Sequence, residues 1–471
     1  MNRIHSWKSH CVVLLVFAVS VVPVAAQTFT TLLSFTGPDG ANPYAGLVQG
    51  PDGNLYGTTI DGGAYGSGNV IQVTPSGEVR SIYDFCAQTN CVDGQYPDGT
   101  LVMGPDGDFY GTTQNGGLYN YGSIFRVSST GALLTMHSFD VSDGVSPYGS
   151  LLLASDGNFY GTANEAGICS GDGGCGTVFV ITPTGKFKTL HNFCMQTGCP
   201  DGEFPVGGLI EGSDGNLYGT TNAGGDSTCP GGGCGTIYKI TFGGAFTSLH
   251  RFHNTDGAYP TPALVELAKG VFFGTTAGGG GNGEGTVYSI TASGVLTTLH
   301  RFSVTSSYIP FVLIPGSDGN AYGTTLGGGT NGGGTIYQVT PGGTLTTEYS
   351  FAQHFYYYLG AMTQGTNGNF YGTTYFGGTD DDGTIYSLSM GLKPFVKVQP
   401  SVGRGGATVS ILGNNLGEAT SVTFNGTPAT FQIVSDTLMT ATVPARASSG
   451  KVSVTGPGYS LRSNVPFWVT P

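Results

Sequence analysis

The chain of 471 residues carries a net charge of −13, and only 10% of its residues are charged. This negative charge argues against nucleic acid and anionic membrane surfaces as partners. Glycine is abundant, with 83 residues, but 39% of the residues are hydrophobic, which excludes a chain that is disordered throughout. We therefore expect a folded, turn-rich, all-β protein.

Residues 1–26 have the pattern of a secretory signal peptide. Arg3 and Lys8 flank the start of an apolar run, and Val24-Ala25-Ala26 forms a small-residue cleavage site. An uncleaved membrane anchor is the alternative, but the run is short for a spanning helix. We expect a mature chain that begins at Gln27, is secreted or held at the cell surface, and does not insert into a membrane.

Residues 27–390 are organised around one short motif. Its first copy is Tyr56-Gly57-Thr58-Thr59, and the copies follow one another at intervals of about fifty residues, which indicates a repeat architecture. The later copies begin at Tyr110, Tyr160, Tyr218, Phe273, Tyr322 and Tyr371. The motif therefore predicts a set of similar structural units in a row.

Each repeat contains four short runs with the alternation, or the β-branched and aromatic content, of strands. In the second repeat they are residues 99–103, 108–113, 123–128 and 132–139. Asp-Gly-Asn or a close variant joins the first two strands as a tight hairpin. The pattern predicts a seven-bladed β-propeller whose last sheet is completed by residues 30–35, which removes an exposed edge. A linear β-solenoid is the alternative, but it would not need complementary strands at its two ends.

The two faces of such a propeller differ. The tight hairpins lie on one face, which we call the hairpin face. The loops between second and third strands and the crossovers between repeats lie on the other, which we call the loop face. Because variable loops on a rigid scaffold carry function, we expect ligands to bind at the loop face.

Eight cysteines remain after removal of the signal peptide, and all of them lie on the loop face. An even number in a secreted chain predicts disulfides within each close pair, although neighbouring loops could exchange partners. A metal site is the alternative, but zinc ligands usually have tighter spacing, so no metal is expected. The pairs are Cys86/Cys91, Cys169/Cys175, Cys194/Cys199 and Cys229/Cys234.

The crossovers supply the candidate ligand-binding residues. Five of them contain Asp-Gly-x-x-Pro, which is typical of an Asx-turn; a ring of carboxylates that holds calcium or a cationic ligand is the alternative. The last two crossovers have tyrosines instead, and this broken symmetry indicates a surface that contacts a ligand. The candidates are Asp39, Asp93, Asp143, Asp201, Asp256, Tyr308, Tyr356, Tyr357 and Tyr358.

One histidine per repeat recurs two residues before the aromatic residue that ends the fourth strand. These residues are His137, His191, His250 and His300. Because each lies in a different outer strand, they cannot converge on one metal ion, and we interpret them as structural.

Residues 394–471 lose the glycine-rich repeat and have the strand pattern of a small immunoglobulin-like β-sandwich. The expected strands are residues 408–412, 421–424, 440–443 and 451–455. The run from Gly405 to Leu416, then Val422-Thr423-Phe424-Asn425-Gly426, resembles the IPT/TIG domain. That resemblance implies a spacer or adhesion unit without catalysis.

The repeat pattern, Asp-Gly-Asn-x-Tyr-Gly-Thr-Thr followed by Gly-Thr-Ile-Tyr, resembles the bacterial GloVer tandem repeat. This resemblance implies a secreted or surface-anchored protein and assigns no reaction. The hairpins are also similar to sialidase Asp-boxes and to virginiamycin-B-lyase-like propellers. Both of those need tryptophans that the repeats lack, because Trp7 lies in the signal peptide and Trp468 in the C-terminal domain.

No group of residues suited to acid–base catalysis is apparent, so we expect no catalytic residues and no cofactor. The sequence favours a monomeric binding or adhesion protein that engages an extracellular glycan or a surface protein through the loop face. A polysaccharide-active hydrolase or lyase on the same scaffold is the alternative.

Overall fold

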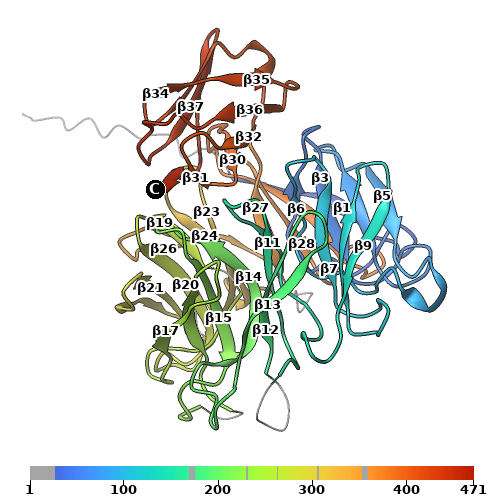
Figure 1. Ribbon diagram of the computed structural model, residues 1–471, viewed down its shortest axis with the longest axis vertical. Coiled ribbons are helices and arrows are strands. Elements are labelled where there is room, and N and C mark those ends of the chain that lie inside the picture. The colour runs from blue at the N-terminus through green and yellow to red at the C-terminus, as the bar shows by residue number, and fades with distance from the viewer. Residues whose placement is uncertain are drawn as a thin grey trace, which may run out of the picture.

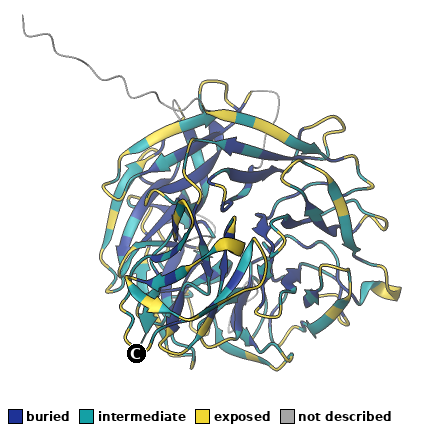
Figure 2. Cartoon of the chain, turned by 90° about the horizontal axis from the view of Figure 1, so that it is seen from above, coloured by how far each residue is buried: buried dark blue, intermediate teal, exposed yellow. Residues whose placement is uncertain are grey.

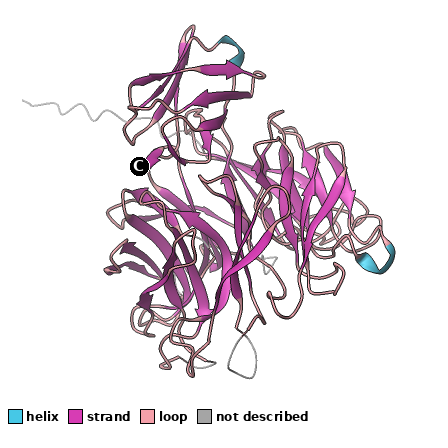
Figure 3. Ribbon diagram, viewed as in Figure 1, coloured by secondary structure: helices cyan, strands magenta, loops and turns pink. Residues whose placement is uncertain are grey.

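The computed structural model describes residues 27–470, apart from residues 169–174, 230–231, 263, 305–306 and 353–358. The expected signal peptide, Cys169, Tyr356, Tyr357 and Tyr358 lie outside the described residues. The described chain is built from strands and two short 3₁₀ helices, η1 (Thr89–Cys91) and η2 (Leu416–Glu418) (Figure 3). No described helix is long and apolar enough to cross a membrane.

The described strands of the repeat region pair into seven antiparallel sheets arranged around a central axis (Figures 1 and 2). We number the sheets in chain order and their strands from the centre outward. Sheet 1 contains β2 (Val48–Gln49), β3 (Leu55–Thr59), β4 (Asn69–Val73) and β5 (Val79–Asp84). Sheet 2 contains β6 (Val102–Met103), β7 (Phe109–Thr113), β8 (Ser123–Val127) and β9 (Leu133–Ser138). Sheet 3 contains β10 (Leu152–Leu153), β11 (Phe159–Ala163), β12 (Thr177–Ile181) and β13 (Phe187–Asn192).

The next sheets repeat the same order. Sheet 4 contains β14 (Glu203–Glu211), β15 (Leu217–Ala223), β16 (Thr236–Ile240) and β17 (Phe246–Arg251). Sheet 5 divides its inner strand into β18 (Ala258–Pro260) and β19 (Val265–Ala268), followed by β20 (Val271–Gly278), β21 (Thr286–Thr291) and β22 (Leu296–Arg301). Sheet 6 contains β23 (Ser307–Pro315), β24 (Ala321–Gly328), β25 (Thr335–Val339) and β26 (Leu345–Ser350).

Sheet 7 joins the two ends of the repeat region. It contains β27 (Leu359–Gln364), β28 (Phe370–Thr374), β29 (Thr384–Ser389) and, as its outer strand, β1 (Thr28–Ser34). β1 pairs antiparallel with β29 from Thr28 opposite Ser389 to Ser34 opposite Thr384. The expectation that the first strand completes the last sheet is confirmed, as are the all-β class and the propeller-like arrangement.

The Asp-Gly-Asn hairpin and the motif tyrosine form one hydrogen-bonded unit. In sheet 4 the carboxylate of Asp214 accepts hydrogen bonds from the backbone N–H and the side-chain amide of Asn216, and from the hydroxyl of Tyr218 at 2.8 Å. Sheet 5 has Lys269 in place of the aspartate, and there Phe273 replaces the tyrosine. The hydroxyl is therefore lost where its acceptor is lost, which identifies the motif as part of the scaffold.

This pairing predicts a compensating effect between two substitutions. We expect Asp214→Lys alone to lower the free energy of unfolding by about 1–3 kcal/mol, because it removes the carboxylate that accepts hydrogen bonds from the Tyr218 hydroxyl and from Asn216. Tyr218→Phe should lower the free energy of unfolding less in the Asp214→Lys variant than in the parent chain. The double variant has the same lysine and phenylalanine as sheet 5, where Lys269 and Phe273 occupy these positions. A double-mutant cycle by urea unfolding measures the difference; strictly additive losses would contradict the pairing.

Aromatic rings and hydroxyls join each sheet to the next. Tyr218 packs against Phe272 of sheet 5, with the rings tilted and their centroids 4.1 Å apart, and the hydroxyl of Thr220 donates to the carbonyl of Thr261 at 3.2 Å. The glycine of the motif leaves room for the aromatic ring of the third strand. A Cβ at Gly219 would lie 2.5 Å from the hydroxyl oxygen of Tyr238. The motif thus combines packing between sheets with a close cross-strand contact.

The C-terminal domain is an immunoglobulin-like sandwich with a buried apolar core that includes Val409, Val422 and Val454. One sheet contains β30 (Lys397–Gln399), β32 (Thr408–Leu412), β36 (Leu438–Thr442) and β35 (Phe431–Ile433). The second contains β34 (Thr427–Ala429), β33 (Ser421–Phe424), β37 (Val452–Gly456) and β38 (Tyr459–Arg462). A parallel pair joins β31 (Val402–Arg404) to β39 (Trp468–Thr470).

This domain sits on the hairpin face of the propeller (Figure 1). The backbone N–H of Phe395 donates to the carbonyl of Thr366 in the hairpin of sheet 7 at 2.9 Å, and the side-chain amide of Asn414 donates to the Thr366 hydroxyl at 2.9 Å. The hydroxyl of Thr437 donates to the carbonyl of Pro51 in the hairpin of sheet 1. The C-terminal domain therefore covers one end of the central axis.

Candidate functional site

A channel runs along the central axis, with a cavity volume of about 1040 Å³. Residues in the inner strands of six sheets line it, together with Leu151, which directly precedes β10 of sheet 3. At the loop face it is bordered by residues at or just beyond the ends of second strands, such as Leu326 in β24 and Ile60 after β3. At the hairpin face it ends at Lys397 and Gln399 of the C-terminal domain. The channel is therefore open toward the loop face and closed by the second domain.

Aromatic side chains surround the loop-face end of the channel, which we call the mouth. All are half-buried, so each keeps part of its surface accessible. Tyr44 packs edge-on against Phe311, with ring centroids 5.4 Å apart. The aromatic residues of the mouth are Tyr44, Tyr148, Tyr259, Phe311, Tyr375 and Phe376. Such a ring offers flat apolar faces of the kind that bind sugars or other planar groups.

Two side chains, Asp98 and Lys397, are the acidic and basic groups among the described residues that line the channel. Burial raises the pKa of Asp98 to about 8. Its Oδ1 atom has no hydrogen-bond partner within the described part of the chain. At neutral pH this carboxyl is therefore mostly protonated, and it offers the channel a hydrogen-bond donor beside the aromatic mouth.

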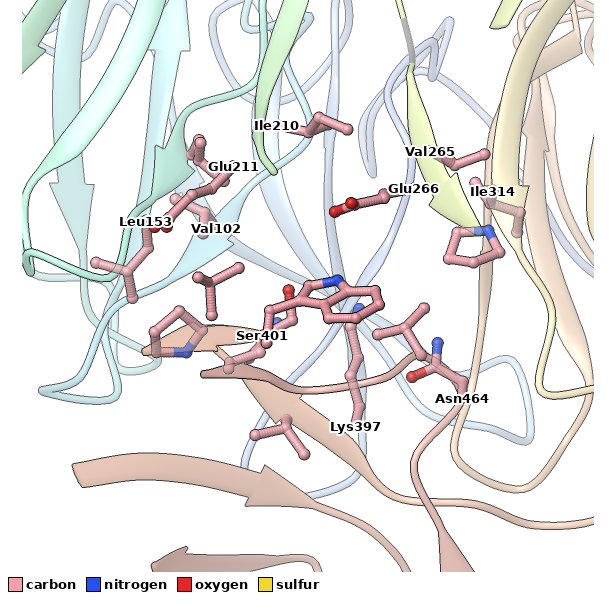
Figure 4. A pocket seen from close by; sticks show the side chains of 18 of the residues that line it. Val102, Leu153, Ile210, Glu211, Val265, Glu266, Ile314, Lys397, Ser401 and Asn464 are labelled. Atoms are coloured by element: carbon pink, nitrogen blue, oxygen red, sulfur yellow. The ribbon is translucent and has the colours of Figure 1, made fainter. Parts of the chain in front are cut away.

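A smaller cavity of about 360 Å³ lies between the propeller and the C-terminal domain, and Glu211 and Glu266 project toward it (Figure 4). The carboxylate of Glu211 accepts bonds from the backbone N–H and the hydroxyl of Ser155, at 2.7 and 2.5 Å. Glu266 accepts the equivalent bonds from Ser213, at 2.8 and 2.5 Å. Burial raises the pKa of both carboxyls, and the serine bonds oppose that shift.

These contacts belong to a wider pattern that links four of the hairpins to the next sheet. Gln49 accepts the N–H of Thr366 at 3.0 Å, and Gln364 accepts that of Ser317 at 2.8 Å. Where the hairpin residue is a proline, which has no N–H, the next sheet has an apolar residue instead. The two cases are Pro51 followed by Met103, and Pro105 followed by Leu153. Glu211 and Glu266 are thus clamps between sheets.

The five crossover aspartates accept local hydrogen bonds at the outer side of the ring. Asp143 contacts the Nε2 atom of His137 at 2.8 Å, and Asp93 accepts the hydroxyl of Tyr83 at 2.8 Å. Asp201 and Asp256 bind His191 and His250 in the same way, at 3.0 and 3.1 Å. Asp39 accepts the N–H and the hydroxyl of Thr36, at 2.8 and 3.1 Å. None of the five is among the described residues that line the channel.

The tyrosine candidates are placed differently. Tyr308 lies in β23 opposite Gly327 and is half-buried, whereas its neighbours Ile309 and Phe311 line the channel. Tyr356, Tyr357 and Tyr358 lie outside the described residues. A ligand-binding role for the nine candidates stays a prediction.

Several channel residues share one position in the repeat. In six repeats the residue directly after the crossover proline lines the channel. In chain order it is Tyr44, Asp98, Tyr148, Val206, Thr261 and Phe311. Lys397 shares no such position, because its place in the channel depends on how the second domain docks.

Three of the expected disulfides are present among the described residues: Cys86–Cys91, Cys194–Cys199 and Cys229–Cys234. Cys175 is also disulfide-bonded, and its expected partner Cys169 lies outside the described residues. One described cluster, Cys194, Cys199 and Glu203, has the spacing of a metal site, but its two sulfurs are bonded to each other. The disulfides are typical of a protein that folds in an oxidising compartment.

Fold and site together define a repeat-built, propeller-like protein with a channel closed at one end by an immunoglobulin-like domain. The chain belongs to the Gloeobacter/Verrucomicrobia repeat family, which matches residues 16–231, 169–314 and 230–427. Residues 395–467 match the IPT/TIG domain. No curated protein matches the chain in sequence.

Solved structures share the fold at low sequence identity. A streptogramin B lyase structure matches 77% of this chain and 97% of its own, with 18% identity and a TM-score of 0.53. A fungal alcohol oxidase of the AA5 family, in complex with copper, matches 95% of this chain and 100% of its own, with 13% identity and a TM-score of 0.50. At these identities the likeness concerns the fold alone.

Proposed function

We propose that this chain is a secreted, monomeric, non-catalytic binding protein that takes the end of a glycan chain into the mouth of the central channel. The observation that carries the proposal is the set of half-buried aromatic rings around that mouth, next to the polar Asp98. Aromatic faces stack on the apolar faces of sugar rings, and a polar group then orients the hydroxyls. The signal-peptide pattern and the disulfides support secretion.

Binding is favoured over hydrolysis because of the acids available. Glycoside hydrolysis ordinarily needs two carboxyl groups on either side of the scissile bond. Asp98 is the carboxyl among the described residues that line the channel. Glu211 and Glu266, in the smaller cavity, are engaged by serine donors. Incubation with polysaccharides should therefore release no reducing ends or unsaturated products, and a release that Asp98→Asn abolishes would instead support the hydrolase or lyase.

A glycan array with the mature chain tests the proposal. We expect Tyr148→Ala to weaken binding of any glycan found by about tenfold, because it removes a stacking face at the mouth. Tyr65→Ala is the matched control, since Tyr65 lies in a loop of the same face with 57% of its surface exposed. No glycan bound, or equal losses in both variants, would count against the mouth as the site. Size-exclusion chromatography with light scattering measures the molar mass and so tests whether the chain is a monomer.

A surface protein is the second candidate partner, and the exposed apolar side chains of one loop favour it. Leu118, Tyr119 and Tyr121 lie between β7 and β8 with exposed fractions of 66%, 53% and 41%. Large exposed apolar groups of this kind often mark protein contacts. A partner that is lost from pull-downs with Tyr119→Ser, but kept with Tyr148→Ala, would favour this function over glycan binding.

A further inference from the structure

The closed end of the channel contains a lysine without a counter-ion. Lys397 lies in β30 of the C-terminal domain, and its side chain extends toward the propeller (Figure 4). It lines both the channel and the smaller cavity. Among the described residues no hydrogen bond or ion pair is found for its ammonium group. The two domains therefore enclose an uncompensated cation at the bottom of the channel.

Such a group is costly unless something compensates its charge. A buried ammonium without a partner is disfavoured, so it either loses its proton or binds an anion. Burial lowers the pKa of Lys397, in agreement with its position between the domains. Two acceptor atoms in the smaller cavity, Oε1 of Gln399 and Oδ1 of Asn464, also have no partner among the described residues. This end of the channel thus has several unused polar atoms.

The surrounding walls are apolar. The residues shared by the two cavities include Val102, Leu151, Ile210, Leu264 and Ile314, one from each of five repeats. A ligand that fills this end must therefore combine an apolar body with a polar group. Since the polar centre is a single cation, the complementary group is a single negative charge.

The other charged groups nearby do not compete for that cation. Glu211 on β14 and Glu266 on β19 line the smaller cavity, and their oxygens accept hydrogen bonds from Ser155, Ser213 and the N–H of Gly270. Asp98 lies near the mouth, and its raised pKa keeps it mostly neutral at pH 7. Burial raises the pKa of both glutamic acids, which favours their neutral forms and so reduces their repulsion of a bound carboxylate.

We propose that the closed end of the central channel binds a monocarboxylate with an apolar body, its carboxylate on Nζ of Lys397 and its apolar part against the inner strands. This site goes beyond glycan binding at the mouth and depends on other residues. Both alkyl and aryl acids have the required chemistry. A neutral ligand of the same shape would leave the cation uncompensated.

Isothermal titration calorimetry on the full mature chain tests the site, with octanoate as the alkyl acid, 1-naphthoate as the aryl acid and octan-1-ol as the neutral control. We expect at least one acid to bind and the alcohol to bind more weakly. Lys397→Met should weaken acid binding by about 10- to 100-fold, because it removes a charge-assisted hydrogen bond and keeps most of the length of the side chain. Lys397→Arg retains the charge and should stay within a few-fold of the parent.

A second measurement separates charge pairing from simple apolar filling. Because burial lowers the pKa of Lys397 in the free protein, binding of a carboxylate should raise it, and binding should be accompanied by proton uptake at any pH where the free lysine is partly neutral. Titrations in buffers with different ionisation enthalpies measure that uptake, which Lys397→Met should abolish. No binding of either acid, equal binding of octan-1-ol, or unchanged affinity in Lys397→Met would overturn the proposal. Tyr148→Ala should leave acid binding unchanged. The proposal of an acid site and the proposal of glycan binding at the mouth can therefore be contradicted independently of each other.

Discussion

Deletion of residues 27–35 is expected to abolish cooperative folding of the propeller, because it leaves the last sheet without its outer strand. The deleted segment supplies Phe35, which is fully buried and donates its N–H to the carbonyl of Gly383 at 3.0 Å. Phe29, in the same segment, stacks on Tyr349 with ring centroids 4.4 Å apart. Loss of one buried phenylalanine alone costs about 3–5 kcal/mol, which is a large share of a domain's typical 5–15 kcal/mol.

The deletion can be checked by urea unfolding followed by circular dichroism. A synthetic peptide of residues 27–36 added in trans should restore the parent transition, since the open edge of β29 provides a template for pairing. A scrambled peptide of the same composition serves as the control and should restore nothing. A deletion variant that unfolds like the parent chain would show that closure by β1 contributes little to stability.

Phe252→Ala is expected to cost about 3–5 kcal/mol of unfolding free energy. Phe252 ends the outer part of sheet 4, is fully buried, and packs edge-on against Tyr288 of sheet 5 with ring centroids 5.2 Å apart. Truncation would leave a cavity at the contact between two sheets, which the surrounding strands cannot readily close.

Chemical denaturation of the variant measures this loss. Val295→Ala is the matched control, because Val295 lies at a hairpin with 63% of its surface exposed and should change stability by less than about 0.5 kcal/mol. Phe193 and Phe302 make the same contact with Tyr238 and Tyr337, so alanine at either should cost a similar amount. A loss below about 1 kcal/mol at all three positions would show that these contacts are not the main link between sheets.

Local patterns predicted much of this fold. The hairpin aspartates, the motif tyrosines and the strand alternation are short-range features, and they define the sheets. The complementary strands at the two ends predicted ring closure. The same reasoning predicted that the recurring histidines are structural, and the structure pairs three of them with crossover aspartates. Among the described residues His300 has no such bond, and the following crossover lacks the aspartate.

The channel was harder to predict because it is built from residues far apart in the chain. Tyr44 packs edge-on against Phe311, although 267 positions separate them in sequence numbering. Lys397 reaches the channel because hydrogen bonds from Phe395 and Asn414 dock its domain on Thr366. No local sequence pattern around Lys397 predicts that the C-terminal domain docks on the propeller in this way. The site therefore depends on tertiary contacts that periodicity and turn chemistry do not encode.

The clamps between hairpins and neighbouring sheets have a consequence for how such a protein can evolve. Four repeats carry a side-chain acceptor for the hairpin before them, and two carry an apolar residue opposite a proline. If the second repeat followed the third, Met103 would face Ser155 and leave its N–H without an acceptor. Gain or loss of one repeat would therefore demand compensating substitutions at both of its borders. Units that look interchangeable in sequence form an ordered series with a fixed number of members.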